Sequence, residues 1–102
     1  MQVIELNATK WKTVFDFYGV LLSSIGAPTW HSESPDALID SMIWGGINAV
    51  VPPYTIRILG AAALPKDVFD HIELVKEALE RARADHRNRR GADVEVAIEI
   101  AS

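Results

Sequence analysis

Three short apolar runs, separated by segments with helical periodicity, constrain the fold of this chain more than any other feature. They cover residues 2–6, 54–59 and 94–100. Neighbouring parallel strands need a crossover connection, which is usually a helix, so this order predicts a parallel sheet. In the last run Val96 and Ile98 alternate with Glu95 and Glu99, which is the pattern of a strand buried on one side. We therefore expect an α/β fold with a three-stranded parallel sheet and helices packed on one face.

Capping residues and apolar spacing define the expected helices. Thr13 begins a capping sequence, and Ser34 before Pro35 indicates a second helix start. A third, long helix is expected after the second strand, with an apolar stripe of Val68, Phe69, Ile72, Val75, Leu79 and Ala82. Residues 61–64 and the polar stretch 86–93 are expected to be loops.

Polar residues at alternate strand positions indicate what lies on the uncovered face of the sheet. Arg57 falls on this face in the middle run. We expect it to lie near Glu5, Glu95 or Glu99, and scattered solvated charges are the alternative.

Composition narrows the class of protein. A chain of 102 residues is long enough for one domain, which we expect to cover residues 1–102. A hydrophobic content of 49% excludes intrinsic disorder, and the absence of cysteine excludes disulfide scaffolds, thiolate metal sites and cysteine nucleophiles. The start lacks the features of a secretory signal, and Pro52-Pro53 interrupts the most apolar stretch, residues 42–56. We therefore expect a cytoplasmic protein without a membrane partner.

Motifs of catalysis and of metal binding are absent from the sequence. It contains no P-loop, no Gly-x-Gly-x-x-Gly fingerprint and no Gly-x-Ser-x-Gly elbow. His31, His71 and His86 lack the spacing of metal ligands, and His71 is expected at the surface. Trp11 and Trp44 are expected in the core or at its edge. We therefore expect no enzyme, no cofactor and no metal.

The distribution of charge gives the first positive indication of function. The 44 residues 13–56 contain no Lys or Arg and carry the whole formal net charge of −4, in Asp16, Glu33, Asp36 and Asp40. Asp36 and Asp40 are four residues apart and share one helix face. Such a face suits a cationic protein surface or a hard metal ion, and a solvated helix face is the alternative. Trp30, in the loop before this helix, is the expected exposed contact residue.

One basic cluster stands near the end of the long helix. It consists of His86 and five arginines, Arg81, Arg83, Arg87, Arg89 and Arg90. Cations are favoured at a helix C-terminus, which is the structural interpretation of the cluster. Contact with RNA is the alternative, although no aromatic residue is interleaved to stack bases. Glu77 lies four residues before Arg81, so spacing alone predicts a simple ion pair.

Residues 27–40 read Ala-Pro-Thr-Trp-His-Ser-Glu-Ser-Pro-Asp-Ala-Leu-Ile-Asp. This segment resembles the signature of the barstar family, small intracellular inhibitors of secreted ribonucleases. The residues that match in register are Pro28, Asp36, Ala37, Leu38 and Asp40. Looser similarity includes the opening strand that ends in Asn7, the turn at 91–93 and the final strand. The resemblance implies the family's fold, a three-stranded parallel sheet with helices on one face.

The resemblance also implies inhibition by an acidic helix and the loop before it, which enter the active site of the nuclease. By position, Asp40 would mimic a substrate phosphate, and Asp36 would be a neighbouring contact. The implied contact residues are Trp30, His31, Ser32, Glu33, Ser34, Asp36, Ile39, Asp40 and, on the last helix, Glu77. The implied partner is a ribonuclease toxin or another cationic protein, as in an immunity or toxin–antitoxin pair, and we expect no nucleic-acid partner.

The chain departs from the family pattern around the acids. Where the family has Gly, Asn, Leu, Tyr and Trp, this chain has Ser32, Ser34, Pro35, His31 and Ile39. The acids are kept while their neighbours change, which fits a cationic partner of altered shape. Two other functions remain open: an adaptor with the same fold that binds another basic protein, and contact with RNA through an arginine-rich loop at residues 81–90.

Overall fold

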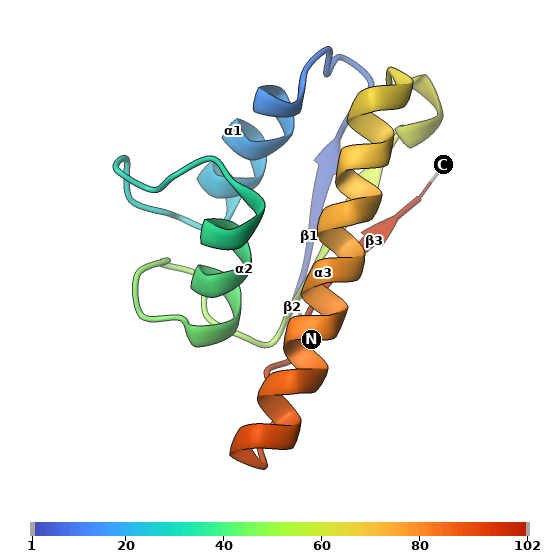
Figure 1. The fold of residues 1–102 in the computed structure, drawn as a ribbon. Coiled ribbons are helices and arrows are strands. Elements are labelled where there is room, and N and C mark those ends of the chain that lie inside the picture. Colours follow the sequence, from blue (N-terminus) through green and yellow to red (C-terminus); the bar gives the residue numbers. More distant parts are fainter. Residues whose placement is uncertain (1, 102) are drawn as a thin grey trace.

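Figure 1 shows the fold of a computed structural model, which describes residues 2–101. Its elements in chain order are β1 (Gln2–Asn7), α1 (Val14–Ser24), α2 (Pro35–Trp44), β2 (Tyr54–Leu59), η1 (Ala61–Ala63), α3 (Lys66–Arg90) and β3 (Val96–Ile100). The short 3-10 helix η1 lies in a segment that the sequence predicts as a loop, so that prediction is wrong. Within the described residues, no helix combines the length and the hydropathy that crossing a bilayer requires.

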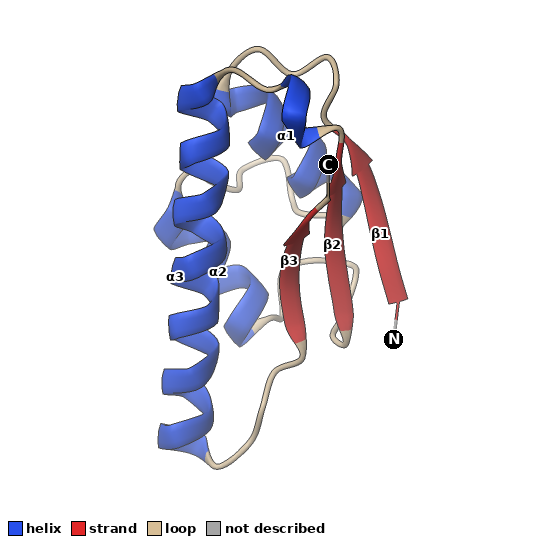
Figure 2. Cartoon of the chain, turned by 90° about the vertical axis from the view of Figure 1, so that its right-hand side faces the viewer, coloured by secondary structure: helices blue, strands red, loops and turns tan. Residues whose placement is uncertain are grey.

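The three strands form one parallel sheet in the order β1-β2-β3. Each crossover moves to the next strand position in the same direction, and the shared handedness of such crossovers puts the connecting helices on the same face. Figure 2 shows α1, α2 and α3 on one side of the sheet, with the other side uncovered by any described helix. The predicted α/β fold, three parallel strands with helices on one face, is confirmed.

The core lies between the sheet and the helices. Strand residues enter it at alternate positions, so that Ile56 and Ile58 of β2 are fully buried and Ile98 of β3 is nearly so. Helix residues enter it at helical spacing, and they include Phe17, Tyr18, Leu21, Leu38, Met42, Val68, Ile72, Val75 and Leu79. Apolar periodicity therefore decides which side of each element packs inward.

The uncovered face of the sheet carries a row of charges. Arg57 Nε lies 3.2 Å from Glu99 Oε1, and Arg57 Nη1 lies 3.4 Å from Glu5 Oε2. The row follows from the strand register, which aligns Glu5 with Arg57 and Arg57 with Glu99. The prediction that Arg57 lies on this face near an acid is confirmed. Because the three side chains are 35–54% exposed, each pair contributes about 0–1 kcal/mol.

Side-chain caps begin α1 and α2 where the sequence indicates. Asp16 Oδ2 accepts hydrogen bonds from the backbone nitrogens of Lys12, at 2.8 Å, and Thr13, at 3.0 Å. These bonds favour the ionised carboxylate and hold the pKa of Asp16 below its ordinary value. Ser34 Oγ accepts a hydrogen bond from the backbone nitrogen of Ala37 at 3.2 Å, which confirms Ser34 as the N-cap of α2.

The long helix α3 continues further than the sequence pattern indicates. Residues 86–90, which we expect to be a loop, form its last turns, so the predicted loop is wrong over these residues. Asp85 and Arg89 form an ion pair of 3.1 Å one turn apart, which supports the helix at this point. Gly91 then ends the helix with a φ of 70°, a left-handed conformation that glycine adopts without strain.

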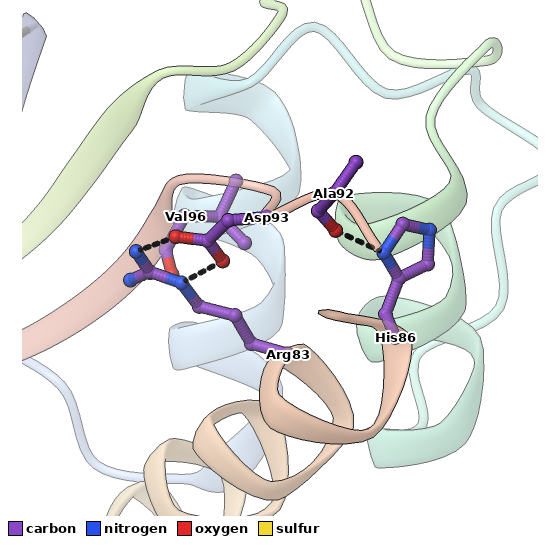
Figure 3. Close-up of polar contacts among 5 residues, drawn as sticks. All are labelled: Arg83, His86, Ala92, Asp93 and Val96. Atoms are coloured by element: carbon purple, nitrogen blue, oxygen red, sulfur yellow. Dashed lines mark hydrogen bonds and ion pairs between the residues drawn. The ribbon is translucent and has the colours of Figure 1, made fainter. Parts of the chain in front are cut away.

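The link from α3 to β3 is tied back to the helix (Figure 3). Arg83 donates hydrogen bonds to both carboxylate oxygens of Asp93, at 2.8 and 2.6 Å, and one to the carbonyl oxygen of Val96 at 3.4 Å. His86 Nδ1 donates to the carbonyl oxygen of Ala92 at 3.2 Å. The pairing with Arg83 holds the pKa of Asp93 below its ordinary value. The last strand consequently begins at Val96, two residues later than the sequence predicts.

Candidate functional site

Asp36 and Asp40 lie one turn apart on the outer face of α2. Leu38 and Met42 are fully buried and turn one side of the helix towards the core. The two acids therefore face outward, and both are exposed. Among the described residues, neither carboxylate has a hydrogen-bond or ion-pair partner. The structure thus presents two negative charges that its own chain does not neutralise.

The charge of this acidic face affects the pKa of Tyr18, a buried residue of α1. Burial of the phenol, together with the negative charge of Asp36, raises the pKa of Tyr18 to about 12. Its hydroxyl lies 2.7 Å from His71 Nε2, and this contact joins α1 to α3. The prediction that His71 is a simple surface residue is therefore wrong, because its ring is partly buried and packs edge-on against Tyr18.

Two tryptophans of the acidic segment lie at the surface. Trp30, in the loop before α2, is 71% exposed, as the sequence predicts. Trp44, at the end of α2, is 59% exposed, so the prediction of a place in the core or at its edge is wrong for Trp44, whereas Trp11 is buried. Trp44 packs against the end of α3, where Arg90 Cζ and the His86 ring centre each lie 4.9 Å from the indole ring centre.

A pocket of about 380 Å³ opens beside these side chains, and we call it the Trp30–Trp44 pocket. Its wall on the loop side consists of Trp30, His31 and Ser32. The side chains that α2 and the following turn contribute include Asp40, Ser41, Trp44 and Ile47. The pocket therefore combines large apolar surfaces with one carboxylate.

A second pocket, of about 190 Å³, lies between α2 and the end of α3. Asp40 and Trp44 line it as well, and Arg89 and Arg90 close it from α3. Asp40 and Trp44 are thus shared between a pocket that is lined by arginine side chains and one that has no Arg or Lys in its lining.

His31 is buried rather than presented to a partner, with only 8% of its surface exposed. Its Nδ1 lies 2.8 Å from the carbonyl oxygen of Ser32, and its Nε2 lies 2.8 Å from Ser41 Oγ. Ser41 Oγ also lies 3.0 Å from the carbonyl oxygen of Leu38 and 3.1 Å from Asn48 Nδ2. The contact role that the resemblance implies for His31 does not fit this burial. The side chain instead anchors the loop to α2.

The donors and acceptors of this cluster follow from its chemistry. A carbonyl oxygen only accepts, so His31 Nδ1 carries the proton shared with Ser32. In the neutral ring Nε2 accepts from the Ser41 hydroxyl, whose oxygen accepts from Asn48. This cluster of hydrogen bonds attaches the loop to α2.

The other predicted contact residues near α2 differ in accessibility. Ser32 and Glu33 are exposed in the loop. Ser34 is partly buried, and its side chain is used as the N-cap. Ile39 is partly buried against the core and lines the second pocket. Of these four residues, Ser32 and Glu33 are therefore the most available to a partner.

The basic cluster lies on the last turns of α3 and not in a loop. Three of its five arginines have partners in their own chain, and these are Arg83, Arg89 and Arg90. For Arg81 and Arg87 no ion pair is formed within residues 2–101. Glu77 is exposed on the same helix and lines neither pocket, and its predicted ion pair with Arg81 is not formed.

The sequence did not predict Trp44 and Ile47 as contact residues, although both line the Trp30–Trp44 pocket. Trp44 follows Asp40 by four residues, a spacing that puts both on one helix face and signals that they belong together. Ile47 has no such signal. Its position depends on the turn after α2, where Gly45 has a φ of 67°.

No three His, Asp or Glu side chains in the described part of the chain come together as a metal site would require. Comparison with protein-family models finds no match to the chain, and comparison with curated proteins finds none either. The site itself therefore has to support any conclusion about function.

Proposed function

We propose that this chain is an intracellular inhibitor of the immunity type, which blocks the active site of a ribonuclease with α2 and the loop before it. The observation that carries the proposal is the pair Asp36 and Asp40, exposed one turn apart without a counter-ion from the described chain. Asp40 takes the position of a substrate phosphate, and Asp36 meets a neighbouring Arg or Lys of the enzyme. The protein acts in the cytoplasm of the cell that makes the nuclease.

Charge complementarity supports this function. Ribonuclease active sites are cationic because they bind phosphate, so fixed carboxylates compete with substrate and also accelerate the encounter. An acid with an internal ion pair would have to break that pair on binding. Within residues 2–101, Asp36 and Asp40 have no such pair to break, and residues 13–56 contain no Lys or Arg that could weaken their field.

The surface beside the acids supports a protein as the partner. Trp30, Trp44 and Ile47 are 71%, 59% and 42% exposed, and all three line the same pocket. Exposed aromatic side chains around a desolvated charge are the anchors that protein interfaces use. These apolar side chains supply no ligand atoms, so they would not contribute to binding a metal ion.

Contact with RNA through residues 81–90 has weaker support. Three of the five arginines in this stretch have partners in their own chain, which reduces the positive charge available to phosphates. Among the residues that the structure describes, one aromatic ring, that of Trp44, packs against the stretch. Arg90 and His86 already occupy its side towards α3, so the part of the ring nearest the arginines is not free for a base.

Affinity capture with this protein, from the extract and the secreted fraction of its own cells, tests the proposal. Captured proteins are assayed for RNA cleavage before and after addition of the purified chain. We expect a ribonuclease whose cleavage is abolished at equimolar addition. Capture of a basic protein without nuclease activity would overturn inhibition and favour an adaptor that uses the same acidic face.

Substitution of the acids tests whether charge carries the binding. Asp40→Ala should weaken the complex by about 2–5 kcal/mol, because a positive group of the enzyme is left buried without its counter-charge. Added salt should slow association. Glu95→Ala, which removes an exposed acid outside α2 and its loop, is the matched control and should change affinity by less than about 0.5 kcal/mol. Full inhibition by the Asp36/Asp40 double alanine variant would refute the proposal.

A further inference from the structure

The Trp30–Trp44 pocket indicates which group of the partner Asp40 meets. On the basis of the proposed function, we propose that this pocket receives one arginine side chain of the partner protein. The guanidinium binds the carboxylate of Asp40. The methylene stem of the arginine lies along the apolar walls, which are Trp30, Trp44 and Ile47.

The chemistry of the walls selects arginine among side chains. A wholly apolar side chain would strip water from Asp40 without giving it a partner, which is costly for a carboxylate. Lysine supplies charge, but its compact ammonium has no plane, so it neither packs flat on an indole nor offers two parallel donors. Arginine combines an apolar stem with a planar cation that packs against tryptophan and binds carboxylates in a fork geometry.

Trp44 already binds a guanidinium of its own chain. Arg90 Cζ lies 4.9 Å from the ring centre of Trp44, on the side of the second pocket. No residue of α3 lines the Trp30–Trp44 pocket, so neither Arg89 nor Arg90 supplies a cation to it. Asp40 therefore offers an unneutralised carboxylate in the Trp30–Trp44 pocket. The indole beside it, Trp44, already packs against one guanidinium, that of Arg90.

The pocket is preformed, because hydrogen bonds hold both of its sides in place. On the loop side, His31 and Ser41 join the segment that carries Trp30 to α2 through a contact of 2.8 Å. On the other side, the backbone nitrogen of Ala49 donates to the carbonyl oxygen of Gly26 at 3.1 Å, which holds the segment after Ile47 against the end of α1. An incoming side chain thus meets walls that need little ordering.

Titration of the free protein with small amides tests the inference without the partner. The probes are N-acetyl-arginine amide, N-acetyl-lysine amide, which keeps the charge but not the plane, and N-acetyl-citrulline amide, which keeps the plane but not the charge. The readout is the set of indole N–H signals in nitrogen–proton correlation spectra. Trp30 and Trp44 report on the pocket, and the buried Trp11 is the internal reference.

We expect saturable shifts of the Trp30 and Trp44 signals with the arginine amide, and binding at least about fivefold weaker with each analogue. Asp40→Asn should remove the preference for arginine over citrulline, and Trp44→Ala should remove the preference over lysine. Both side chains are exposed, so these variants should fold, which circular dichroism verifies. Asp67→Asn, at an exposed acid on α3, is the control and should leave the titration unchanged.

Equal binding of the three amides, or the absence of a saturable shift at Trp30 and Trp44, would overturn the inference. If the captured nuclease is nevertheless inhibited through Asp40, the inference fails and the proposed function stands. If the arginine amide binds as expected but no nuclease is inhibited, the pocket is confirmed as an arginine site and the proposed function fails.

Discussion

Replacement of Ser41 by alanine should loosen the candidate site from within. Ser41 Oγ is the atom at which the loop before α2, the helix itself and the segment after it meet. It lies 2.8 Å from His31 Nε2, 3.1 Å from Asn48 Nδ2 and 3.0 Å from the carbonyl oxygen of Leu38. Alanine keeps the helix but removes this oxygen, so the histidine nitrogen and the amide nitrogen lose their partner together.

The expected loss of stability follows from the burial of these groups. His31 and Ser41 are 8% and 6% exposed, so water cannot easily replace the missing oxygen. A buried polar group left unsatisfied costs about 1–3 kcal/mol. Asn48 is less buried, and its Oδ1 already lacks a partner in the described structure, so its share is at the lower end of that range. Ser41→Ala should therefore cost about 2–4 kcal/mol, which lowers Tm by about 10–20 °C.

Urea denaturation followed by circular dichroism measures this loss. An unchanged m value would indicate that unfolding exposes the same amount of surface in the variant and in the parent. Ser32→Ala is the matched control, because Ser32 is exposed and its side chain forms no hydrogen bond among the described residues. The control should change stability by less than about 0.5 kcal/mol. A Ser41→Ala variant as stable as the control would refute the network, and so would an unshifted Trp30 indole signal.

Three further outcomes are expected. Asp16→Asn should lower Tm at neutral pH. The hydrogen bonds that depress the pKa of Asp16 stabilise the fold above the ordinary value of 3.8, so the difference from the parent should vanish as pH falls through the depressed pKa in a series of thermal melts. Leu38→Ala, at a fully buried position of α2, should cost about 2–5 kcal/mol in urea denaturation. Arg57→Ala should lower the free energy of unfolding by about 0–1 kcal/mol per ion pair in urea denaturation. This loss should shrink in high salt, because both ion pairs are exposed to solvent.

Near-neighbour signals explain why the order of the elements could be predicted. The carboxylate of Asp16 accepts a hydrogen bond from the backbone nitrogen of Thr13, three residues before it, and the hydroxyl of Ser34 accepts one from that of Ala37, three residues after it. Alternation in β3 depends only on which residues are apolar, and it predicted a sheet with one open face. The row of charges around Arg57 followed from this alternation once the strands were taken as parallel neighbours.

The end of α3 shows where such signals stop. The apolar stripe of the helix ends at Ala82, and the arginine-rich residues beyond it have the composition of a solvated loop. They are helical because the Asp85–Arg89 pair supports the turn, Gly91 closes it, and Arg83 binds Asp93 from the returning chain. The last of these contacts joins residues ten positions apart, which no helical or strand periodicity encodes.

The sequence by itself determined that Asp36 and Asp40 face solvent, because helical periodicity places them opposite the apolar residues of the same short segment. Only the tertiary structure decided that His31 is buried, that Trp44 meets Arg90, and that a pocket opens beside Asp40. Each of these features depends on where separate segments come to lie against one another. That placement is set by packing of the whole core, so no local sequence pattern at the site residues predicts it.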